Sequence, residues 1–138
     1  MSKLIENAPD LEINKVLYLS RGLEVPPQRV REQRVVWNLL KHLNSRQFRF
    51  VAVDDGDGMT TLSRDPKRAM LEAMELIFNL DEAYLYVRSS AASSQTTPYY
   101  IFLVLGNDLD VVSDWSFDSK AKDGFNAAME SFDAEEFA

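Results

Sequence analysis

The sequence predicts a single α+β domain, in which a mostly antiparallel sheet of about five strands packs against three or four helices. Two observations predict this class. Some segments repeat their apolar residues at helical spacing, whereas others are short and rich in β-branched and aromatic residues. The connections between the expected strands are short, as antiparallel pairing allows. The length of 138 residues, of which 46% are hydrophobic and 27% charged, suits one globular domain, residues 1–138.

The first part of the chain is expected to be helical. The stretch from Asp10 to Gly22 fits a short helix or a strand, and we favour the helix, within an N-terminal extension of residues 1–25. Pro27 then begins a helix that runs to about Asn44. At about 100° per residue, this helix gathers its apolar residues on one face and most of its charges opposite. The apolar face consists of Val36, Leu39, Leu40 and Leu43.

A hairpin and a second long helix are expected next. Residues 47–53 have the aromatic and β-branched content of a strand, and the segment DDGDG at 54–58 lets the chain reverse into a strand at 59–62. Pro66 stands at the first position of a helix that continues to about Asn79. This helix should be nearly buried, because its polar residues form only a narrow stripe of Arg68, Glu72, Glu75 and Asn79.

Three strands are expected in the second half. Residues 84–87 form a short strand, and the small polar segment 89–98 is expected to be a flexible loop. Residues 99–105 are continuously apolar, as in a central strand that is buried on both faces. Residues 110–118 alternate, so that their aspartates lie on one side of a strand and their larger apolar residues on the other.

A last helix is expected from about Ser119, and Gly124 lies inside it, although glycine disfavours a helix interior. One stripe of this helix carries Ala121, Phe125, Ala128, Met129 and Phe132. The end of the chain, residues 133–138, is expected to be a frayed tail.

Three segments of the second half resemble a group of small phage and plasmid proteins that have no assigned activity. They are DEAYLYV at 81–87, LVLGND at 103–108 and VVSDWS at 111–116. The resemblance covers about half of the chain, and the long serine-rich loop departs from the tight turn of such proteins. It implies an accessory protein of a mobile element, and it implies neither an activity nor a site residue.

Charge is unevenly distributed along the chain, whose formal net charge is −7. Residues 1–53 carry nine Lys or Arg against five Asp or Glu, a net of +4, whereas residues 54–138 carry six against seventeen, a net of −11. An acidic surface repels nucleic acids and anionic lipids and attracts basic partners. We therefore expect a protein partner with a basic surface, and the candidate acidic surface consists of Asp108, Asp110, Asp114, Asp118, Asp123 and Glu130.

A basic stripe offers an alternative binding surface, on the helix from Pro27 and the strand after it. It consists of Arg31, Arg34, Lys41, Arg46 and Arg49. Such a stripe could follow a phosphate backbone, which would make the protein an adaptor or regulator that contacts nucleic acid. The same charges also solvate the outer face of any amphipathic helix, so both interpretations stay open.

Catalytic and metal chemistry have little support in the sequence. There is no cysteine, and His42 is the single histidine. The DDGDG segment does not match a calcium loop, because Thr60 stands where glycine is required and Pro66 where glutamate is required. Aspartate and glycine are also ordinary residues of a tight turn. We therefore expect no cofactor, no metal site and no enzymatic activity.

These observations predict a non-enzymatic accessory protein that binds another macromolecule. One such function is inhibition of a basic host or defence protein that handles nucleic acid, through an acidic surface that imitates nucleic acid. No apolar run reaches the roughly 18 residues of a membrane span, and the start does not resemble a signal peptide. We expect a cytoplasmic protein that does not bind membranes, and its oligomeric state stays open.

Overall fold

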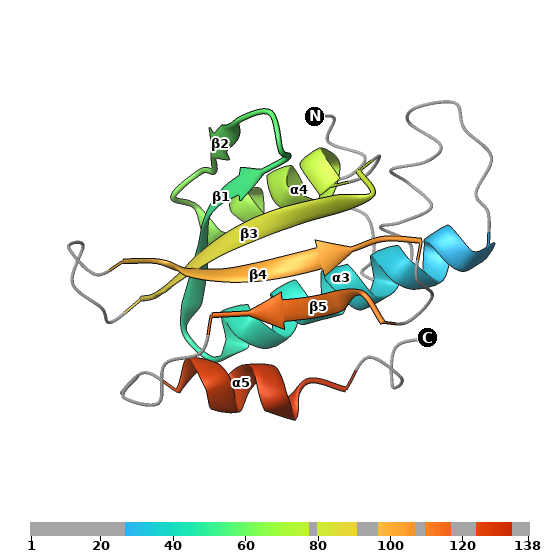
Figure 1. The fold of residues 1–138 in the computed structure, drawn as a ribbon. Coiled ribbons are helices and arrows are strands. Elements are labelled where there is room, and N and C mark those ends of the chain that lie inside the picture. Colours follow the sequence, from blue (N-terminus) through green and yellow to red (C-terminus); the bar gives the residue numbers. More distant parts are fainter. Residues whose placement is uncertain (1–26, 78–79, 91–96, 107–109, 117–123, 134–138) are drawn as a thin grey trace.

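The computed structural model describes residues 27–77, 80–90, 97–106, 110–116 and 124–133. They form one five-stranded antiparallel sheet and three helices, which confirms the predicted single-domain α+β class. The strand order is β2-β1-β3-β4-β5 (Figure 1). Within these ranges, no helix is both long enough and apolar enough to cross a bilayer.

Helix α3 (Pro27–Ser45) confirms the helix predicted from Pro27. All four residues of its predicted apolar face are buried, with at most 1% of their surface exposed. Val35 and Trp37, which flank that face, are buried as well, and α3 contacts α4 and α5 in addition to β1. The helix therefore lies between the other two helices of the layer. More of its surface is buried than in a helix that packs through one apolar face alone.

The predicted hairpin is formed by β1 (Phe48–Asp54) and β2 (Met59–Thr61). Phe48 and Phe50 lie in the core, and the register of β1 against β3 shifts between Phe50 and Ala52. This irregularity changes the alternation of β1 by one residue, so that Val53 also faces the core and Asp54 faces away from it.

Helix α4 (Pro66–Ile77) begins where the sequence predicts, because Asp65 caps it. The Asp65 carboxylate accepts a hydrogen bond from the backbone N–H of Arg68, at 3.0 Å. Six of the twelve residues of α4 are buried, so the helix is less buried than the sequence predicts, because the residues of its first turn, 66–68, are exposed. The two positions beyond Ile77 in the predicted helix, 78 and 79, lie outside the described residues.

Strand β3 (Glu82–Ser89) is longer than the predicted strand at 84–87. It is paired on both sides, with β1 and with β4 (Tyr99–Val104). Because pairing with β4 reaches back to Glu82 and pairing with β1 continues to Ser89, the strand is longer at both ends. Ser89, predicted as the start of a flexible loop, is buried and pairs with Phe48. The rest of that loop, residues 91–96, lies outside the described part of the chain.

The last strand, β5 (Val112–Trp115), does not alternate as the sequence predicts. The register of β4 against β5 shifts between Phe102 and Leu103, which leaves Ser113 as an extra residue of β5. Asp114 nevertheless stands opposite Phe102, whereas Trp115 stands opposite the buried Ile101. Asp114 and Trp115 therefore lie on opposite faces of the sheet, as predicted.

Helix α5 (Phe125–Ser131) starts later than predicted, because Gly124 is its N-cap with φ 77° and not an interior residue. Phe125 anchors the helix: its ring stacks on Tyr99, with centroids 4.3 Å apart, and meets Phe48 edge-on at 5.6 Å. Trp115 adds a hydrogen bond from its indole N–H to the Asn126 side chain, at 3.0 Å. The predicted extension 1–25, the helix start at Ser119 and the tail beyond residue 133 are not among the described residues.

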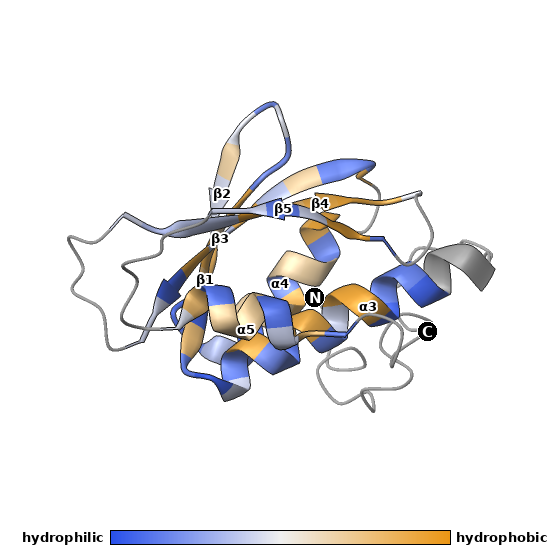
Figure 2. Ribbon diagram, turned by 60° about the horizontal axis from the view of Figure 1, so that its bottom comes forward, coloured by the Kyte–Doolittle hydropathy of each residue, from blue (hydrophilic) through white to orange (hydrophobic). Residues whose placement is uncertain are grey.

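The molecule thus has two layers, with the sheet above and the helices on one side of it (Figure 2). Alternate residues of β1, β3, β4 and β5 point into the core between the layers. The residues between them lie on the opposite face of the sheet, and none of the three helices covers that face. We call it the open face.

Candidate functional site

Aromatic side chains are concentrated on the open face. The prediction that strand 99–105 is buried on both faces is wrong, because Ile101 and Leu103 are buried but Tyr100 and Phe102 are only partly so. Beside them on β3, the buried Leu85 and Val87 alternate with residues of the open face. The aromatic residues of this face are Tyr84, Tyr86, Tyr100 and Phe102.

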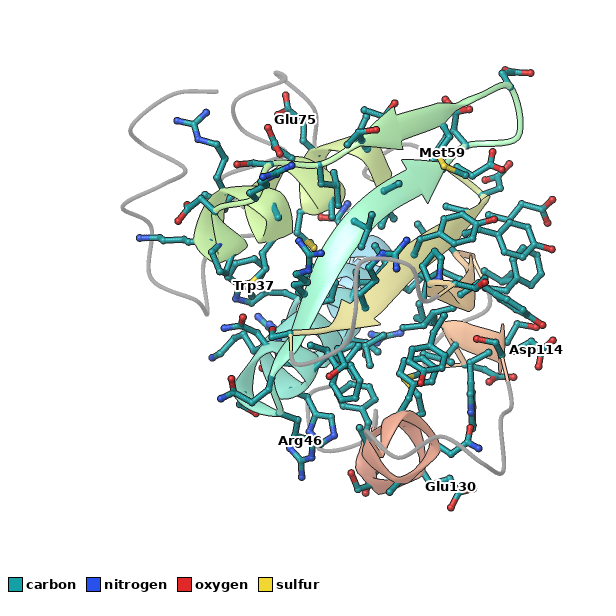
Figure 3. All side chains as sticks on the ribbon, turned by 90° about the vertical axis from the view of Figure 1, so that its left-hand side faces the viewer. Trp37, Arg46, Met59, Glu75, Asp114 and Glu130 are labelled. Carbon is teal, nitrogen blue, oxygen red and sulfur yellow. The ribbon has the colours of Figure 1, made fainter. Side chains whose placement is uncertain are left out.

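One row of paired residues crosses all five strands on the open face. Asp54 on β1 pairs with Met59 on β2 and with Tyr84 on β3, Tyr84 pairs with Phe102 on β4, and Phe102 pairs with Asp114 on β5. We call these five residues the transverse row. Figure 3 shows its two ends, Met59 and Asp114, on the side of the sheet away from α3 and α4.

The transverse row contains the large apolar side chains with the greatest exposure among the described residues. Met59 is 59% exposed and Tyr84 is 39% exposed. The Tyr84 ring stacks on Phe102, with centroids 4.7 Å apart and an interplanar angle of 25°, and lies edge-on to Tyr100 at 5.7 Å. Exposed, mutually supported aromatic rings are typical of interface anchors, because little side-chain freedom remains to be lost on binding.

Asp114 is held by the neighbouring Tyr100. The Tyr100 hydroxyl donates a hydrogen bond to the Asp114 carboxylate, at 3.1 Å, and the Tyr100 backbone N–H donates to the Ser116 hydroxyl at 2.9 Å. The hydrogen bond to the carboxylate is the main cause that raises the pKa of Tyr100 above its ordinary value. The phenol therefore stays protonated and keeps orienting Asp114 throughout the neutral range.

Replacement of Asp114 by asparagine is expected to lower the pKa of Tyr100, because the charged acceptor that favours the protonated phenol is lost. A raised pKa in the folded state stabilises the fold below the unfolded pKa of about 10, and this contribution disappears as the pH rises through the folded pKa. NMR titration of ring-labelled tyrosine in the wild type, in Asp114→Asn and in the control Glu130→Gln measures this. Identical Tyr100 titrations in the wild type and Asp114→Asn would contradict the assignment.

The open face is charged oppositely at its two ends. Arg49 and Arg88 stand directly opposite each other where β1 begins and β3 ends. At the other end, Asp54 and Asp114 lie in the transverse row and Glu82 follows it on β3. The aromatic rings lie between, so the face has a basic end, an aromatic centre and an acidic end.

The predicted acidic surface is only partly described by the structure. Asp110, Asp114 and Glu130 are all exposed. Asp114 belongs to the open face, whereas Glu130 lies on α5 (Figure 3). The other predicted members, Asp108, Asp118 and Asp123, lie outside the described residues.

The predicted basic stripe is divided between two sides of the molecule. Arg31 and Arg34 are partly buried on α3, and the Arg34 Nε atom is fully buried, whereas Lys41 is exposed. Arg46 lies at the end of α3, where it donates a hydrogen bond to His42 Nδ1 at 3.2 Å. Arg49 lies on the open face instead, because it alternates with the buried Phe48 and Phe50.

The remaining chemical candidates have structural roles. Asp55 accepts hydrogen bonds from the backbone N–H groups of Asp57 and Gly58, at 2.9 and 3.0 Å, as the turn interpretation of DDGDG predicts. His42 joins α3 to α5 through its Nε2 atom, 2.8 Å from the Ala128 carbonyl oxygen. No group of three or more His, Asp or Glu side chains that could hold a metal ion occurs in the part of the chain that the structure describes.

A scan against protein-family models and searches of curated proteins and of solved structures find no match to this chain. The resemblance to phage and plasmid proteins therefore stays a prediction. Tyr84, Tyr86 and Phe102 are not among the site residues predicted from the sequence. Their alternate positions on two neighbouring strands are the signal that could have found them, because period two places such pairs on one face.

Proposed function

We propose that the protein is a non-enzymatic binding protein that docks on a protein partner through the open face of its sheet. The observation that carries this proposal is the transverse row, in which exposed Met59 and Tyr84 stand among carboxylates instead of being buried in the core. Aromatic residues and methionine are enriched in the centres of protein interfaces. Antiparallel sheets with one helix-covered face commonly leave the other face available for such contacts.

The distribution of charge favours a protein partner over a polyanion. A nucleic acid strand bound across the aromatic centre would extend from the basic end of the open face to its acidic end. There its phosphates would be repelled by Asp54, Glu82 and Asp114. A protein surface can instead match both ends, with basic side chains opposite the carboxylates. A basic protein that handles nucleic acid has such side chains, and for this reason we keep inhibition of such a protein, by an accessory protein of a mobile element, as the specific form of the proposal.

Affinity capture with matched variants tests the proposed docking surface. We expect Tyr84→Ala and Asp114→Lys each to reduce retention of the partner by about tenfold or more, the effect of removing an interface anchor. Glu130→Lys, which makes the same charge change on α5, is expected to retain the partner as the wild type does. Equal retention by all the variants would exclude the open face as the docking surface, and unfolding curves verify that each variant is folded.

Contact with nucleic acid is the second candidate function, and one observation favours it. Arg49 and Arg88 stand directly opposite each other on β1 and β3, so two guanidinium groups at this end of the open face could contact neighbouring phosphates. Tyr86 and Tyr100 pair in the next row and could stack on bases. Retention that is lost after nuclease treatment, together with salt-dependent binding of single strands that Arg49→Glu removes, would favour this function over the first.

A further inference from the structure

Resting on the proposed function, we infer that the Tyr84–Phe102 pair is a binding site for an arginine side chain of the partner protein. The two rings form a stacked platform on adjacent strands, with Tyr100 supporting it edge-on. A carboxylate residue flanks each ring on the side away from the other ring. Tyr84 on β3 pairs with Asp54 on β1, and Phe102 on β4 pairs with Asp114 on β5. Aromatic surface and carboxylates in one row are the two features that attract an organic cation.

The spacing of the sheet brings both features within reach of a single side chain. Neighbouring strands lie about 4.8 Å apart, so a planar cation on either ring is one strand away from a carboxylate. Cation–π contacts operate within about 6 Å of the ring centroid. The Tyr100 hydroxyl already orients the Asp114 carboxylate in the free protein. The Asp114 side chain therefore loses less conformational entropy when a ligand binds.

The chemistry of the row favours guanidinium over ammonium. Guanidinium is flat and weakly hydrated, so it can stack on an aromatic ring while its edge donates two parallel hydrogen bonds to a carboxylate. A lysine ammonium is a strongly hydrated point charge and cannot make both contacts in this way. Arg49 and Arg88, at the far end of the open face, would repel a cation there and restrict it to the acidic end.

NMR titration with short capped peptides tests this inference without the natural partner. The probes are Gly-Ser-Arg-Ser-Gly, the same peptide with lysine, and the same peptide with citrulline, which keeps the shape of arginine without its charge. We expect the arginine peptide to shift the ring signals of Tyr84 and Phe102, and the lysine peptide to bind about three- to fivefold more weakly. The citrulline peptide is expected to cause no shift at the same concentration.

Matched variants separate the contribution of the rings from that of the carboxylate. Tyr84→Leu, which keeps an apolar side chain without the aromatic ring, is expected to weaken binding of the arginine peptide about three- to fivefold. Phe102→Leu serves the same purpose if the first variant does not fold, with the Tyr84 ring then as the reporter. Asp114→Asn should also weaken binding, whereas Glu130→Gln on α5 should leave it unchanged.

Several results would overturn the arginine site. Equal binding of the citrulline and arginine peptides, lysine binding as tight as arginine binding, or unchanged affinity of Tyr84→Leu would each contradict it. An oligothymidine that shifts the ring signals when the arginine peptide does not would assign the rings to nucleic acid. If these titrations fail while affinity capture still depends on Tyr84 and Asp114, the docking function stands without the arginine site, so the two failures are distinguishable.

Discussion

Replacement of Phe125 by alanine is expected to lower the free energy of unfolding by about 3–5 kcal/mol, the usual cost of truncating a buried phenylalanine. Phe125 is 1% exposed, stacks on Tyr99 with an interplanar angle of 3°, and meets Phe48 edge-on. It thereby joins α5 to both β4 and β1. Its loss leaves a cavity beneath the sheet and removes two aromatic contacts, neither of which the rest of this seven-residue helix replaces.

Denaturant and thermal unfolding measure this effect, and the midpoint of thermal unfolding should fall by roughly 10–20 °C. Ala127→Ser is the matched control, because Ala127 is an exposed residue of the same helix. Its effect should stay within about 0.5 kcal/mol. A loss below about 1 kcal/mol for Phe125→Ala would mean that α5 contributes little to the stability of the core.

Replacement of Glu32 by alanine is the second large effect that we expect, a loss of about 2–3 kcal/mol. Glu32 lies on α3 and is 1% exposed, and its carboxylate accepts a hydrogen bond from the backbone N–H of Gly106. Gly106 follows β4 with φ 94°, so this contact ties the end of β4 to the helical layer. Removal of the carboxylate leaves a partly buried N–H without its charged acceptor.

Graded substitutions identify the hydrogen bond as the cause. Glu32→Gln keeps an oxygen that can accept from Gly106 and should cost less than Glu32→Ala, whereas Asn44→Ala, at an exposed position of α3, should be nearly neutral. Unfolding curves and hydrogen exchange of the Gly106 amide measure the stability and the local protection. Unchanged exchange of that amide in Glu32→Ala would show that the contact does not hold the end of β4.

Much of the secondary structure could be predicted because its signals are local. Pro27 and Pro66 mark the starts of α3 and α4, and the apolar face of α3 follows from the spacing of its leucines. The start of α5 could not be predicted from its apolar stripe, since the conformation of Gly124 decides where the helix begins. The length of β3 likewise depends on its two neighbouring strands.

Prediction of the candidate site was less successful for the same physical reason. Charges were grouped by their position along the chain, and this grouping placed Arg49 with the residues of α3 although it lies on the open face. The sequence identifies Asp114 as a candidate, but it predicts that its cross-strand neighbour Phe102 lies in a strand buried on both faces. An apolar strand has the same composition whether one or both of its faces are covered.

The sequence by itself determined the fold class, the hairpin and the core-facing residues of α3, since propensity, spacing and turn chemistry act over a few residues. Only the tertiary structure decided which face of the sheet the helices cover. It also aligned Asp54, Tyr84, Phe102 and Asp114 in one row, although 60 positions separate the first from the last. Strand register is set by pairing between distant segments and by the irregularities of β1 and β5, which no local pattern specifies.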